Sequence, residues 1–137
     1  MRVLLDANVV LDVLLNRAPW ATEAKTIWQA NDEGQLTAYI TATTITDIFY
    51  VARRIAGLSI AQTAVQTCLT AFEICNVDRP TLERASMLTG DDFEDNLQIA
   101  CAEISSLDAI ITRDPNDFAS ASILVLTPRE ALTKLSS

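Results

Sequence analysis

Residues 1–15 read MRVLLDANVVLDVLL, and this stretch decides the fold. Residues 3–5 form a short apolar run that ends at Asp6, a pattern typical of a buried parallel strand whose carboxyl end meets solvent. The residues that follow, 8–15, predict a helix directly after that strand. Because ligands bind at the carboxyl ends of parallel strands, we expect Asp6 to point into a ligand-binding crevice.

The same alternation of strand and helix continues through the rest of the sequence. We expect strands over residues 39–41, 74–77, 109–111 and 123–126, and helices over 19–31, 44–57, 59–72, 81–88, 94–104 and 128–135. Pro19 is expected in the first turn of its helix, Gly57 as a helix stop and Ser59 as the cap of the next helix. Short apolar strands separated by helices predict one three-layer α/β/α domain over residues 1–137, with a central, mainly parallel sheet.

Composition excludes several mechanisms before any motif is considered. The 137 residues contain no histidine, which excludes a Ser-His-Asp triad, a Cys-His pair and imidazole-bound zinc. Any hydrolysis must therefore use carboxylates. The net charge of −8 argues against a surface that coats nucleic acid, although a bound divalent cation would reverse the sign locally.

Cysteine usage and the first residues indicate a compartment. Cys68, Cys75 and Cys101 are odd in number and lack CxxC spacing, which favours buried thiols in a reducing environment. Asp6 and Asp12 interrupt the first apolar stretch, so it does not resemble a signal peptide, and no later apolar run could span a bilayer. We therefore expect a soluble, cytoplasmic protein without a membrane partner.

Acidic residues occur at four places where strands are expected to end or helices to begin. These are Asp6, Asp47, the group Asp91, Asp92, Glu94 and Asp95, and Asp114 with Asp117. Each has a structural explanation alone, as a helix cap, a first-turn acid or, for Asp91 with Glu94, a capping box. Together they can converge on one edge of the sheet. Clustered carboxylates repel each other unless a cation is present, and hard oxygen ligands favour Mg²⁺ or Mn²⁺.

Other residue types supply candidates for substrate binding. Arg53, Arg54 and Arg113 are the basic residues nearest these motifs and are suited to hold a phosphate. Trp20, Trp28 and Tyr50 could stack on unpaired bases, although packing of amphipathic helices explains the two tryptophans equally well.

Four motifs, in order and spacing, resemble a PIN domain nearly from end to end. They are LLDANVVLD (4–12), TTITDIFYV (43–51), DDFEDNLQIACA (91–102), and DAIITRDPNDF (108–118) followed by ILVLTPREAL (123–132). The family includes the VapC-like toxins of bacterial toxin-antitoxin pairs. The resemblance implies Mg²⁺- or Mn²⁺-dependent endonucleolytic cleavage of RNA. It also implies an antitoxin partner and a homodimer that joins two active sites.

The resemblance also implies roles for individual residues. Asp6 matches the first-strand aspartate and Asp95 the helix aspartate, both expected as direct metal ligands. Asp114 matches the acid after the final TR pair, and Asp117 is an additional or alternate ligand. Asp47 completes the catalytic set, but the family usually carries glutamate there, and aspartate is shorter by about one carbon–carbon bond. Thr112 resembles a small hydroxyl residue beside the metal, but we interpret it mainly as a strand end.

The short Asp47 side chain leaves a second function open, that of a catalytically weak or inactive PIN-like binding module. Two other acidic classes fit less well. A haloacid dehalogenase phosphatase needs a second aspartate where this chain has Asn8, and a receiver domain needs a late lysine, for which Lys25 and Lys134 are badly placed. None of the three glycines lies in a phosphate-cradling loop, which disfavours a nucleotide-binding fold.

Overall fold

A parallel sheet of five strands forms the centre of the computed structural model, which describes residues 1–137. The strand order is β3-β2-β1-β4-β5, and all four neighbouring pairs are parallel. The strands are β1 (Arg2–Leu5), β2 (Thr37–Thr41), β3 (Glu73–Cys75), β4 (Ala109–Ile111) and β5 (Leu124–Leu126). The prediction of a mainly parallel sheet is confirmed.

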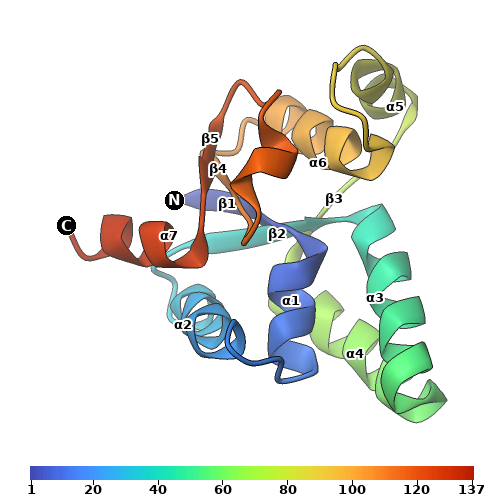
Figure 1. Cartoon of the computed structure of the whole chain (residues 1–137), viewed down its shortest axis with the longest axis vertical. Helices are drawn as coiled ribbons and strands as arrows, with labels where there is room; N and C mark the ends of the chain where they lie inside the picture. The colour runs from blue at the N-terminus through green and yellow to red at the C-terminus, as the bar shows by residue number, and fades with distance from the viewer.

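Helices cover both faces of this sheet, as Figure 1 shows. They are α1 (Ala7–Leu14), α2 (Ala21–Asp32), α3 (Ala42–Ala56), α4 (Leu58–Ala71), α5 (Arg79–Ser86), α6 (Phe93–Ile104) and α7 (Pro128–Leu135), with a short 3-10 helix η1 (Pro115–Phe118). In Figure 1, α5 and α6 lie on one side of the sheet and α1, α2 and α4 on the other. The three-layer α/β/α fold expected from the sequence is therefore confirmed. No helix combines the length and the apolar character that crossing a bilayer would require.

Strand β1 shows how the sheet joins the two helical layers. Val3 and Leu5 belong to the larger core cluster with residues of α1 to α4, whereas Leu4 belongs to a second cluster with Ile99 of α6 and Phe118 of η1. Successive strand side chains point to opposite faces, so one apolar run serves both cores. This is why the central strands are apolar throughout rather than alternating with polar residues.

The strand order places a topological switch point between β1 and β4. The chain proceeds from β1 to β2 and β3 on one side and later returns to β4 on the other side. The Asp6 N–H donates to the carbonyl of Ile111 at 3.0 Å, which ties the two strand ends together. Crevices at such points are where open α/β sheets bind ligands. Asp6 and Thr112, the first residues after β1 and β4, meet there.

The starts of α2 and α4 differ from the sequence prediction. Pro19 lies in a turn before α2, whose N-cap residue is Trp20, rather than in the first helical turn. Gly57 ends α3 as predicted, but the same residue, not Ser59, is the N-cap of α4, with φ 95° and ψ 170°. Such backbone angles are open almost only to glycine, so the turn is tighter than a serine cap would allow.

Candidate active site

A cavity of about 420 Å³ opens where the ends of β1, α3, α6 and η1 meet. We call it the acidic cleft, and its polar lining residues are Asp6, Asn8, Asp47, Tyr50, Arg54, Asp92, Glu94, Asp95, Gln98 and Asp117. Six of them are acidic and one is basic. The structure thus brings together four of the five predicted site residues. Asp114 does not line the cleft, but its negative charge lies close enough to help raise the pKa of Asp6.

Asp6 is the acid of the acidic cleft whose carboxylate is most firmly fixed by burial and hydrogen bonds. It is only 8% exposed. The Thr112 hydroxyl donates to its Oδ2 at 3.0 Å, and the Gln98 Nε2 donates to its Oδ1 at 3.3 Å. It makes no side-chain cap bond to α1, so capping does not explain its presence. Burial raises the pKa of Asp6, and the bonds from Gln98 and Thr112 oppose that rise.

Thr112 connects the two strand-end acids. It is fully buried, and its hydroxyl donates to Asp6 while accepting from the Asp114 N–H at 3.1 Å. Our sequence interpretation treated Thr112 mainly as a β-branched strand end, whereas the structure gives its hydroxyl two specific partners. The available signal was its position, because a hydroxyl residue after β4 lies beside the acid after β1 whenever these strands are neighbours.

Asp95 lies at the start of α6, where the sheet-facing helix meets the acidic cleft. The helix is capped by Asp92, whose Oδ1 accepts from the Asp95 N–H at 3.1 Å, so a single N-cap at Asp92 replaces the predicted Asp91–Glu94 capping box. Burial, together with the charges of Asp92, Asp6 and Asp117, raises the pKa of Asp95 to about 7. A cation placed here would relieve that repulsion and favour the ionised form.

Asp47 and Glu94 face each other across the acidic cleft. Thr41 caps α3 by accepting from the Thr44 N–H at 3.1 Å, so the helix begins before Thr44 and Asp47 lies in its second turn, not its first. Burial, the charge of Asp47 and a hydrogen bond with Asp47 raise the pKa of Glu94. Glu94 was not among the predicted site residues.

A second charged network lies beside the site. Asp12 is 1% exposed, and its Oδ1 accepts from Arg17 Nε at 2.9 Å and from Arg113 Nη1 at 3.3 Å. The Arg113 guanidinium also lies 3.8 Å from the centroid of the Trp20 ring, and its Nε is 3.9 Å from Asp114 Oδ2. Sequence analysis had treated Asp12 only as an interruption of an apolar stretch. Arg113 is thus engaged by Asp12 and Trp20, outside the cleft.

The remaining predicted substrate-binding residues divide between surface and core. Arg54 and the 60% exposed Tyr50 line the acidic cleft from successive turns of α3. Arg53 is exposed but does not line the cleft. Trp28 packs against Phe72 with ring centroids 4.6 Å apart, so its role is in packing. Of the residues predicted to bind phosphate or stack on bases, only Arg54 and Tyr50 therefore line the cleft.

The donor set fits a hard divalent cation. Carboxylate and amide oxygens are what Mg²⁺ and Mn²⁺ prefer, the sequence contains no histidine, and no thiol lines the cleft. No three acidic side chains stand close enough to chelate an ion unaided. Mutual repulsion keeps free carboxylates apart, and water commonly completes the coordination of Mg²⁺. A further fit is the side-chain oxygen of Gln98, which is buried and has no hydrogen-bond partner.

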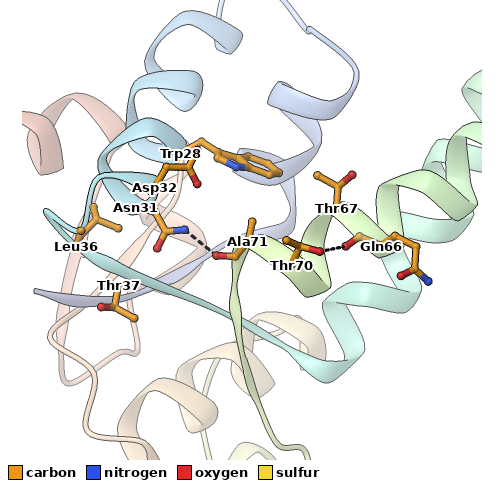
Figure 2. A pocket seen from close by; sticks show the side chains of 10 residues that line it. Trp28, Asn31, Asp32, Leu36, Thr37, Gln66, Thr67, Thr70 and Ala71 are labelled. Carbon is orange, nitrogen blue, oxygen red and sulfur yellow. Dashed lines mark hydrogen bonds between the residues drawn. The ribbon is translucent and has the colours of Figure 1, made fainter.

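The largest cavity of the protein lies elsewhere. Figure 2 shows this space of about 710 Å³ between α2 and α4, bordered by Trp28, Asn31 and Thr67. Asn31 there donates to the Ala71 carbonyl at 2.8 Å and accepts from the Ala38 N–H at 2.9 Å. Its amide therefore joins α2 to its neighbours in the fold, and no group of acids accompanies it.

This geometry defines a class of protein with a three-layer α/β/α fold and an acidic cleft at the switch point of the sheet. The chain belongs to the PIN domain family, whose model matches residues 2–116. No significant match was found among curated proteins. The sequence resemblance to PIN domains is confirmed.

Solved structures share the fold over most of the chain. A toxin–antitoxin complex from Klebsiella pneumoniae contains a chain with 24% identity and a TM-score of 0.68, covering 92% of this chain and 97% of that one. Mycobacterium tuberculosis VapC20, described as a sarcin-ricin loop cleaving toxin, has 15% identity and a TM-score of 0.73 over 89% and 96%. DNA-bound VapBC from Salmonella typhimurium has 13% identity and a TM-score of 0.74 over 93% and 98%. At these identities the likeness establishes the fold.

Proposed function

We propose that the chain is a Mg²⁺- or Mn²⁺-dependent endoribonuclease that cleaves RNA phosphodiester bonds, and that it is the toxin of a toxin-antitoxin pair. The observation that carries this proposal is the acidic cleft, where six acidic side chains converge at the switch point of a chain that has no histidine. Asp6 and Asp95 are the direct metal ligands in this proposal, with Asp114 and Asp117 as additional ligands and Asp47 as the fourth catalytic acid.

The bound cation would hold the scissile phosphate and lower the pKa of a water molecule for attack. The residues of the chain do the rest. Thr112 and Gln98 hold the Asp6 carboxylate in one orientation through their hydrogen bonds. Asp47 and Glu94 line the cleft together and are the groups placed to accept a proton from water or return one to the leaving oxygen, and the pKa of Glu94 is raised chiefly by burial and by the charge of Asp47.

An RNA substrate is supported by the only basic residue that lines the acidic cleft. Arg54 forms no ion pair and lies one helical turn after Tyr50, whose ring is exposed. A guanidinium can hold a phosphate through two hydrogen bonds, and an exposed ring can stack on an unpaired base. A PIN-fold neighbour described as a sarcin-ricin loop cleaving toxin supports the same substrate class.

Partners are proposed from the same relatives. Several neighbours with this fold were solved with antitoxins, as the toxin–antitoxin and VapBC complexes show. We extend that arrangement to this chain as an antitoxin partner. A homodimer and a cytoplasmic location are part of the same proposal, supported by the VapC-like resemblance and by three buried free cysteines.

A panel of single-stranded and structured RNAs, incubated with Mn²⁺, Mg²⁺ or EDTA, tests the activity. The wild-type protein should cleave only with a divalent cation, and Asp6→Asn and Asp95→Asn should lose at least about 100-fold in rate. Asp32→Asn, an exposed acid on α2 outside the cleft, is the matched control and should cleave normally. Cleavage in EDTA, or full activity in Asp6→Asn, would contradict the proposal.

A catalytically weak or inactive binding module is the second candidate. Two observations favour it: Asp47 replaces the longer glutamate usual in the family, and no three acids form a ready-made chelating group. Tight Mn²⁺ binding by the wild-type protein without cleavage of any RNA would select this function.

A further inference from the structure

One buried side-chain atom of the protein lacks a hydrogen-bond partner, and it is Gln98 Oε1. Gln98 itself is 6% exposed and lines the acidic cleft. Buried polar atoms elsewhere are satisfied, as in Thr41 and Thr44, whose hydroxyls bond each other at 2.9 Å. A buried acceptor without a donor lowers stability, so its retention in a cleft indicates a partner that arrives from outside the chain.

The orientation of the Gln98 amide follows from its neighbour. Its Nε2 donates to Asp6 Oδ1 at 3.3 Å. Exchanging the nitrogen and the oxygen would place two acceptors against each other, because an ionised carboxylate has no proton to donate. The amide therefore keeps its nitrogen towards Asp6, and in this orientation Oε1 is the atom without a partner.

The position of Gln98 on α6 places it among the proposed metal ligands. Asp95 lies three residues before it and Glu94 four residues before it, so all three share one face of the helix. All three also line the acidic cleft. None of the polar side chains that line the cleft donates to Oε1. A ligand that carries its own protons can supply the donor.

We propose that Gln98 is a positioning residue whose Oε1 accepts a hydrogen bond from a water molecule bound to the cation, while its Nε2 orients Asp6. Water on a divalent cation is a strong donor because the cation withdraws charge from its oxygen. The inference rests on the metal site of the proposed function but does not require RNA cleavage. It also assigns Gln98 two separate hydrogen bonds, which two substitutions can distinguish.

Mn²⁺ affinity, measured by calorimetry and by electron paramagnetic resonance without RNA, is the test. Gln98→Met keeps the length of the side chain but removes both hydrogen bonds, and should weaken Mn²⁺ binding about 10- to 100-fold. Gln98→Glu keeps an acceptor but loses the donor, and should bind Mn²⁺ at least ten-fold more tightly than Gln98→Met. If only the bond to Asp6 mattered, the glutamate variant would bind as weakly as the methionine variant.

Three controls complete the design. Gln66→Met makes the same change on exposed α4 and should leave affinity unchanged. Asn8→Asp adds one negative charge to the cleft lining and measures how much that charge alone raises Mn²⁺ affinity. The rise in Mn²⁺ affinity from Gln98→Met to Gln98→Glu must be larger than this effect. Thermal melting in EDTA identifies any variant that fails to fold. If Gln98→Met fails to fold, Gln98→Asn, which withdraws the amide by one methylene, takes its place with the same expected loss of Mn²⁺ affinity.

Four results overturn the proposal: no Mn²⁺ binding by the wild type, unchanged affinity in Gln98→Met, no recovery in Gln98→Glu, or recovery no larger than that in Asn8→Asp. Mn²⁺ binding that depends on Gln98 in a protein that cleaves no RNA would support the proposal while contradicting the ribonuclease function. The two proposals therefore fail separately.

Discussion

At the scale of single residues, Asp6, the most buried carboxylate of the acidic cleft, is held by neutral side chains. Thr112 and Gln98 each donate one hydrogen bond to Asp6, and Thr112 also accepts from the Asp114 backbone. Neutral donors orient a carboxylate without neutralising it, so the negative charge stays available for a cation. A lysine or arginine in either place would orient Asp6 equally well but would compete with the metal.

Arg54 is the one positively charged side chain that lines the acidic cleft, and its removal should weaken RNA binding more than catalysis. We expect Arg54→Ala to raise KM about ten-fold with little change in kcat, because a charge-assisted bond to substrate phosphate contributes about 1.5–3 kcal/mol. Arg53→Ala removes the adjacent exposed arginine, which does not line the cleft, and should have little effect. Steady-state kinetics on one short RNA, with Mn²⁺ saturating, measures both. Equal effects of the two substitutions would show that only the general charge of α3 matters.

At the scale of elements, the turn at Gly57 fixes how α3 packs on α4. Gly57 has φ 95° and ψ 170°, which a residue with a Cβ adopts only at a cost of about 1–3 kcal/mol. The space around it is open, so Gly57→Ala should destabilise through the backbone alone. We expect the free energy of unfolding in urea to fall by that amount, against almost no change in Ser59→Ala. An unchanged midpoint in Gly57→Ala would mean that the hairpin relaxes without cost.

Elements defined by local signals were predicted well, and those defined by distant contacts were not. Helix α7 matches its predicted range, 128–135, because Thr127, Pro128 and Glu130 supply a cap, a first-turn proline and a capping box within four residues. Strand β4 likewise matches residues 109–111. Gly57 ends α3 as its local pattern predicts, but it also caps α4 in place of Ser59 because the tight α3–α4 turn depends on how the two helices pack, which no local pattern records.

The site follows the same division. Sequence motifs selected Asp6, Asp47, Asp95 and Asp117, which the fold gathers in one cleft. They did not select the neighbours of Asp6, because Gln98 and Thr112 lie 92 and 106 residues away along the chain. Glutamine in a helix and threonine at a strand end are common in any fold. Only the pairing of β1 with β4 and the position of α6 make them partners of Asp6.

At the scale of the whole molecule, the acidic cleft makes stability depend on pH in an unusual direction. Asp6, Glu94 and Asp95 all have raised pKa values, chiefly through burial, and that of Asp95 rises from 3.8 to about 7. A raised pKa means that the folded state binds protons more tightly than the unfolded state. The stability that these groups contribute is thus complete near pH 4 and is lost as pH rises towards about 7.

Thermal melting from pH 5 to pH 8 tests this linkage. In EDTA we expect the melting temperature to fall with rising pH, and Asp95→Asn to flatten the fall and to melt higher than the wild type at pH 8. Mn²⁺ should reverse the trend, because the cation binds the ionised carboxylates and stabilises the fold more as protons leave. Asp32→Asn should behave like the wild type in both series.

The range stays above pH 5 because Asp78, Glu103 and Glu130 have lowered pKa values and add the ordinary loss of stability in acid. A wild-type protein that becomes more stable with rising pH in EDTA would show that its acids are already relieved of their repulsion, which would remove the electrostatic reason for a cation in the cleft.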